Sequence, residues 1–107
     1  GLFDGSEYDN ITYDAVECKE HLEVADKITK ESIVMLKNDG LLPLDVNKIK
    51  TIGIIGPNAN SRKALIGNYH GTSSQYVTVS EGIQQYVQGR ARVLFSEGCA
   101  LFQKRWQ

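Results

Sequence analysis

The order of two patterns constrains the fold of this chain most strongly: a helix, then a short apolar strand. Residues 31–44, ESIVMLKNDGLLPL, carry the end of the helical pattern through an Asp-Gly turn to a proline. The apolar run TIGII at residues 51–55 follows and stops at a Gly-Pro pair. A β-branched run without polar alternation is typical of a strand buried on both faces of a parallel sheet. This order predicts an α/β fold.

A second helix and strand complete the pattern. Thr78 is expected to cap a helix over residues 79–87, with Glu81 completing a capping box and Gly89 ending the helix. A strand is predicted over residues 91–95. Strand, helix and strand with a crossover of this length predict parallel, right-handed pairing. Because a complete doubly wound sheet has more strands, we expect the start of such a sheet in an incomplete domain.

The first helix is predicted from about residue 19 to residue 36. Its apolar residues recur at helical spacing, and His21 on this stripe is expected to be packed. Oppositely charged residues four positions apart indicate a solvated opposite face. The β-branched pair Ile33-Val34 leaves open an earlier change to extended chain at about residues 33–37.

Composition excludes several classes of function. The chain has 107 residues and a formal net charge of -1, so we expect one domain at most, no nucleic-acid partner and no membrane partner. No apolar run is long enough to span a bilayer, and no signal-peptide pattern begins the sequence, which favours the cytoplasm. Cys18 and Cys99 could pair in principle, but two lone cysteines without metal-ligand spacing are expected to be small buried apolar residues.

The glycines within and directly after the first strand do not form a nucleotide site. A dinucleotide fingerprint needs G-x-G-x-x-G at the start of a helix, but Gly53 and Gly56 have another spacing and Pro57 follows them. The next segment, residues 57–77, is a long loop rich in small and polar residues, with one helical turn expected near residues 62–65. Loops of this length inside a domain are commonly functional or docked on another surface.

Several segments together resemble one enzyme family. Five sequence motifs occur in the same order as in family 3 glycoside hydrolases, which include β-glucosidases and β-xylosidases. These motifs are SIVMLKN, LLPL, IGPNAN, GNYHGTSSQYVTVSEGI and VLFSEGC. The resemblance implies that residues 1–17 are a linker or arm leaving an N-terminal (β/α)8 barrel. It implies that residues 18–107 begin the C-terminal α/β-sandwich domain.

The resemblance also implies a reaction. Such enzymes are retaining, exo-acting β-glycosidases that remove terminal non-reducing sugars from oligosaccharides or β-glycosides with two carboxyl groups roughly 5 Å apart. Both carboxyl groups are expected outside this chain, so no catalytic residue is predicted within it. Glu97 follows a strand but matches neither motif, and Glu81 is explained by capping. His70 has no partner at a recognisable spacing for a metal or a nucleophile, and no cofactor or metal is expected.

The loop at residues 67–78 is the candidate substrate site. By resemblance it leans over the barrel mouth and lines the leaving-group subsite, where sugars meet flat aromatic faces and short polar groups. The candidate residues are Tyr69, His70, Thr72, Ser73 and Gln75. The alternative is that Asn68 and Tyr69 fix the loop to its own domain.

Two functions from other classes are alternatives to this interpretation. The chain could be a non-catalytic carbohydrate-binding or protein-interaction module, which upstream and downstream sequence with catalytic carboxylates would exclude. A flavodoxin-like regulator is disfavoured, because the first strand ends in Gly-Pro-Asn and not in an acidic cluster.

Overall fold

The chain divides into two units where Asp39 meets Gly40. The computed structural model describes residues 3–69 and 71–101. Gly40 adopts a positive φ of 88°, as expected for the glycine of the predicted turn.

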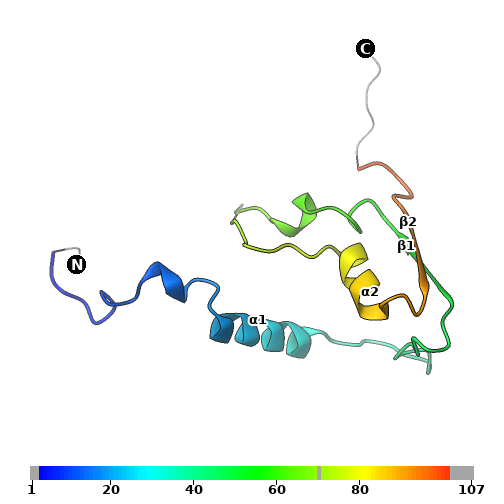
Figure 1. Cartoon of the computed structure of the whole chain (residues 1–107), viewed down its shortest axis with the longest axis horizontal. Coiled ribbons are helices and arrows are strands. Elements are labelled where there is room, and N and C mark those ends of the chain that lie inside the picture. The colour runs from blue at the N-terminus through cyan, green and yellow to red at the C-terminus, as the bar shows by residue number, and fades with distance from the viewer. Residues whose placement is uncertain (1–2, 70, 102–107) are drawn as a thin grey trace, which may run out of the picture. The chain divides into compact units, whose positions relative to one another are not determined.

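The first unit contains a 3-10 turn at Tyr13–Ala15 and helix α1 at Lys19–Ser32 (Figure 1). The helix ends where the β-branched pair begins, since Ile33 is already extended with φ -75° and ψ 121°. The sequence analysis left two positions open for the end of this helix, and the structure has the earlier one. β-Branched side chains crowd the preceding helical turn, which accounts for this ending.

The surface of α1 is solvated all round. Lys30 Nζ lies 2.6 Å from Asp26 Oδ2, and Lys19 Nζ lies 3.7 Å from Glu23 Oε1, so the expected i,i+4 charge pairing is present. The prediction for His21 is wrong: this side chain is exposed, as are all residues of the helix. The apolar stripe that includes it has no covering layer within its own unit.

The second unit contains strand β1 (Thr51–Ile55), helix α2 (Val79–Val87) and strand β2 (Arg92–Ser96), with a 3-10 turn at Lys63–Leu65. The two strands pair in parallel, with Ile52 opposite Val93 and Ile54 opposite Phe95, so the predicted parallel pairing is confirmed. Figure 1 shows α2 beside the strands; a long loop connects β1 to this helix. The α/β class and the incomplete sheet are thus as expected.

Only one face of β1 is covered in this sheet, which corrects the prediction of burial on both faces. Ile54 is 6% exposed, whereas Ile55, which points to the opposite face, is 75% exposed. Successive side chains of a strand alternate between faces, and α2 lies against one face. Among the residues that the structure describes, the buried apolar side chains are those of Ile54, Ala59, Val87 and Ala91.

The ends of α2 and β2 differ slightly from the sequence expectation. Gln88, not Gly89, caps α2 in a left-handed conformation (φ 47°), and Gly89 continues it with φ 78°. Arg90 supports this ending by donating from Nε to the carbonyl of Val87 (3.1 Å) and from Nη2 to that of Tyr86 (2.8 Å). Such bonds satisfy carbonyl groups that a helix end leaves open.

Strand β2 begins one residue later than predicted. Its first residue, Arg92, donates its backbone N–H to the carbonyl of Lys50 at 2.9 Å, and Ala91 is buried before it. At the other end, the N–H of Gly56 donates to the carbonyl of Ser96 at 3.0 Å. Across residues 3–69 and 71–101, no helix has both the length and the apolar character needed to cross a bilayer.

Candidate functional site

The candidate site is the polar loop that leaves β1 at Gly56 and enters α2 at Thr78. Inside its first part, the N–H of Leu65 donates to the carbonyl of Arg62 at 3.0 Å, which closes the short turn predicted near this position. Along Ser61–Val77, the described side chains are exposed or half-buried. The loop is therefore a surface feature whose two ends are held by the core.

The entry into α2 is a complete capping box, as predicted. Thr78 Oγ1 accepts from the N–H of Glu81 at 3.2 Å, and Glu81 Oε2 accepts from the N–H of Thr78 at 2.9 Å. Two N–H groups that the helix start would leave unsatisfied are thus paired reciprocally. Capping explains the presence of Glu81 without a catalytic role.

The second carboxylate oxygen of Glu81 has a partner that the sequence did not indicate. Arg62 Nη2 lies 3.1 Å from Glu81 Oε1. The backbone N–H of Thr78, followed by the Arg62 guanidinium, holds the pKa of Glu81 below its ordinary value, because both favour the charged carboxylate. The same carboxylate therefore connects the helix start to the first part of the loop.

The Thr78 hydroxyl makes a further long-range bond. It donates to Asn60 Oδ1 at 3.0 Å while it accepts from Glu81, and Thr78 is only 2% exposed. Next to it, the N–H of Ser80 donates to the carbonyl of Ala59 at 2.9 Å. No short motif signals these bonds, because their partners lie far apart in sequence; only the capping box could be found from spacing.

The candidate sugar-binding residues fall into different environments. Tyr69 is completely exposed, and Thr72 and Gln75 are exposed as well. Ser73 is half-buried, and its hydroxyl donates to the carbonyl of Gln75 at 2.7 Å. His70 lies outside the described residues. The structure thus brings Ser73 and Gln75 together and leaves the phenol ring of Tyr69 open to solvent.

Tyr76 shapes the loop, a role that sequence reasoning missed. Its hydroxyl accepts from the N–H of Ser73 at 3.0 Å, and its side chain is half-buried. Asn68 and Tyr69, considered above as the residues that fix the loop, are both exposed. Tyr76 makes this internal contact instead, so the ring of Tyr69 is not engaged in holding the loop.

The two carboxylates considered above, Glu81 and Glu97, are not arranged for a catalytic role. Glu97 directly follows β2 and is exposed, whereas Glu81 is held in the helix cap. Within the part of the chain that the structure describes, no group of three or more His, Cys, Asp or Glu side chains could hold a metal ion. Cys18 is half-buried and Cys99 exposed, both as free thiols, so the expected burial of Cys99 is not found.

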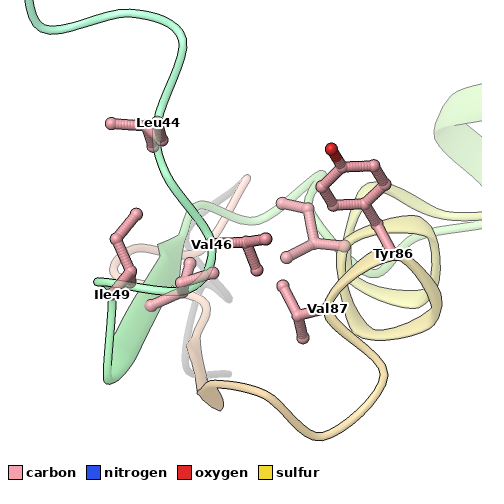
Figure 2. Close-up of a pocket in the computed structure, with 7 residues that line it drawn as sticks. Leu44, Val46, Ile49, Tyr86 and Val87 are labelled. Atoms are coloured by element: carbon pink, nitrogen blue, oxygen red, sulfur yellow. The ribbon is translucent and has the colours of Figure 1, made fainter.

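An apolar hollow of about 220 Å³ lies between α2 and the segment before β1 (Figure 2). Figure 2 shows Leu44, Val46 and Ile49 on the segment before β1, and Tyr86 and Val87 on α2. Its lining residues are Leu44, Val46, Ile49, Ile52, Ile83, Tyr86 and Val87. Since nearly all of its wall is hydrocarbon, this hollow lacks the polar groups that a sugar needs.

Comparison with known proteins gives a consistent result. Residues 33–104 match the family model described as the glycosyl hydrolase family 3 C-terminal domain. A β-xylosidase of Formosa agariphila is 40% identical over 108 residues, which cover 92% of this chain and 15% of that protein. β-D-xylosidase 3 of Arabidopsis thaliana is 39% identical over 92 residues, covering 81% of this chain and 12% of the relative.

A third relative carries a double name. The β-xylosidase/α-L-arabinofuranosidase 2 of Medicago sativa subsp. varia is 36% identical over 104 residues, covering 92% of this chain and 13% of its own length. The chain thus spans no more than 15% of the length of these relatives. No solved structure matches the chain significantly.

Proposed function

Because this chain belongs to the glycosyl hydrolase family 3 C-terminal domains, we propose that it serves as the first part of the second domain of a β-xylosidase. The observation that carries the proposal is the match over residues 33–104 together with relatives whose names are those of β-xylosidases. The whole enzyme would remove terminal β-linked xylose from an oligosaccharide. In this proposal, residues 1–17 connect to an N-terminal (β/α)8 barrel.

The proposed reaction is a double displacement with retention. It needs one carboxylate as nucleophile and one carboxylic acid as acid/base. We assign neither role to this chain. Glu81 is committed to the cap of α2 and to Arg62, and a carboxylate held in its charged form is a poor proton donor.

The contribution of this segment to the substrate would come from its polar loop. An exposed aromatic ring can stack on the C–H face of a sugar, and the ring of Tyr69 is free for this role. Thr72 and Gln75 offer a hydroxyl and an amide to sugar hydroxyl groups. Ser73 would hold the backbone of Gln75 in place, since its hydroxyl donates to that carbonyl. The loop would thus line the leaving-group subsite.

The test uses the full-length protein whose reading frame contains this segment. It is assayed with para-nitrophenyl β-xyloside, β-glucoside and α-L-arabinofuranoside, and with xylotriose. We expect the β-xyloside to be cleaved fastest and xylotriose to lose single xylose units from its non-reducing end. Proton NMR should show β-xylose as the first-formed anomer.

Two results would contradict the proposal. Preferred cleavage of the β-glucoside would move the enzyme to the β-glucosidase type. Binding of xylo-oligosaccharides without release of any sugar would favour the alternative, a non-catalytic carbohydrate-binding module.

A further inference from the structure

The two ends of the polar loop are joined at the start of α2 by several contacts. Asn60 Oδ1 accepts from Thr78 Oγ1 across 18 positions of sequence, and Arg62 Nη2 reaches Glu81 Oε1 across 19 positions. The N–H of Ser80 adds a bond to the carbonyl of Ala59. These contacts form one cluster, here called the loop anchor: Ala59, Asn60, Arg62, Thr78, Ser80 and Glu81.

The capping of α2 does not require the side chains of Asn60 and Arg62. The capping box is complete between Thr78 and Glu81 alone. Removing the carboxamide of Asn60 leaves both bonds of the box in place, and so does removing the guanidinium of Arg62. The contribution of these two side chains is therefore to the loop and not to the helix.

Their bonds limit the freedom of the loop. A chain of this length gains many conformations when its ends are released, and each fixed contact at its base removes some of them. Thr78 is buried although Asn60 is exposed, so the bond between them is partly shielded from competing water, whereas the Arg62–Glu81 pair is more exposed and weaker. Asn60 should therefore hold the loop more strongly than Arg62.

We propose that Asn60 and Arg62 are positioning residues, which fix the loop on the start of α2 so that Tyr69 and Gln75 meet the leaving-group sugar. This inference rests on the proposed function of the loop. Neither residue touches the sugar in it. They act by keeping the loop in one arrangement, which lowers the entropy lost when an oligosaccharide binds.

The first test needs no catalytic activity. Amide hydrogen exchange is measured in the full-length protein for wild type, Asn60→Ala and Arg62→Ala, with Asn58→Ala as a control at an exposed asparagine of the same turn. We expect faster exchange at residues 63–77 in Asn60→Ala, a smaller increase in Arg62→Ala, and wild-type exchange in α2. Unchanged exchange in the loop, or equal acceleration in α2, would overturn the anchor.

The second test separates positioning from a general structural role. For Asn60→Ala, kcat/KM on xylobiose should fall about threefold to tenfold, mainly through KM, as expected for the loss of one hydrogen bond. Hydrolysis of para-nitrophenyl β-xyloside should stay within about twofold of wild type, since an activated aryl group depends less on this subsite. Asn60→Asp, which keeps an acceptor for Thr78, should restore the xylobiose value.

The outcomes are distinguishable. Equal losses on both substrates, or no rescue by Asn60→Asp, would overturn the positioning role. A wild-type protein that cleaves neither substrate would contradict the proposed function, and the exchange experiment would still decide whether the anchor holds the loop.

Discussion

The guanidinium of Arg62 lies 3.1 Å from the carboxylate of Glu81, although 19 positions of sequence separate them. The other oxygen of the same carboxylate accepts from the N–H of Thr78 at the start of α2. One acidic side chain thus takes part in a local motif and in a tertiary contact at once. This arrangement gives several measurable consequences.

Replacing Thr78 with valine should destabilise α2. The substitution keeps the shape of the side chain but removes the cap acceptor and the donor to Asn60. Loss of an N-cap costs about 1 kcal/mol, so exchange of the α2 amides in the full-length protein should become about fivefold faster. Thr78→Ser retains the hydroxyl and serves as the control. A valine variant with wild-type exchange in α2 would show that the cap contributes nothing.

Acid should remove the contribution of Glu81 to stability. The N–H of Thr78 and the guanidinium of Arg62 hold the folded-state pKa of this carboxyl below its ordinary value, so its contribution is fully present above the ordinary value and is lost as the pH falls through the folded-state pKa. Thermal unfolding of the full-length wild type and of Glu81→Gln should therefore differ near neutral pH and converge once the pH has fallen below the folded-state pKa of Glu81. Glutamine keeps an acceptor for the cap. A difference that grew on acidification would contradict this assignment.

Removing the ring of Tyr69 should affect natural substrates selectively. In the full-length enzyme, Tyr69→Ala is expected to lower kcat/KM on xylobiose about tenfold, because a stacking contact of roughly 1 to 2 kcal/mol is lost. Activity on para-nitrophenyl β-xyloside should change little, and so should the melting temperature, since the ring is completely exposed. Tyr69→Phe should behave as wild type if stacking is the contact. Equal losses of kcat/KM on both substrates would show that the loop has a structural role and does not line the leaving-group subsite.

The 107-residue chain alone should not hydrolyse aryl β-xylosides or β-glucosides. Both catalytic carboxylates are expected outside this chain, because Glu81 is held in the cap of α2 and Glu97 matches neither catalytic motif and is exposed after β2. Purified chain is assayed at high concentration against both substrates, with Glu97→Gln as the matched variant. Turnover by the chain that disappears in Glu97→Gln would place the acid/base in this segment.

The same chain should self-associate or behave as a loosely packed monomer. Ile55 on the open face of the sheet is 75% exposed, and Tyr86 on α2 is 72% exposed. Apolar surface of this kind favours association in water. Sedimentation should show association that rises with concentration, or near-UV dichroism should be weak. Ile55→Thr should reduce association, and a sharply unfolding monomer of the unaltered chain would be the contrary result.

Features that depend on the spacing of nearby residues could be predicted from the sequence. Burial that depends on the packing of another element against the sheet could not. The cap of Thr78 and Glu81 was predictable because its partners lie three positions apart. The apolar run at residues 51–55 was expected to be buried on both faces, but Ile54 alone in this run is fully buried, on the face that α2 covers. Burial of Ile55 was expected from its neighbours in sequence, but it requires a layer that this unit does not contain.

The spacing of residues in the sequence could not predict which polar side chains form tertiary hydrogen bonds and ion pairs. Nothing in the order of residues connects Arg62 to Glu81 or Asn60 to Thr78, since the return of the chain to α2 brings them together. The candidate sugar-binding residues of the loop were identified from their side-chain chemistry alone. Their chemistry could not show that the Ser73 hydroxyl is engaged with Gln75 or that Tyr76 holds the loop.

The double use of the Thr78 hydroxyl restricts natural variation at this position. Ser, Thr, Asp and Asn are ordinarily interchangeable as N-caps, because each supplies an acceptor oxygen. Here the capping hydroxyl must also donate a hydrogen bond to Asn60 Oδ1. An aspartate would keep the helix start but place a charge against the oxygen of Asn60. Among functioning relatives, we therefore expect hydroxyl residues alone at this cap wherever the asparagine is present.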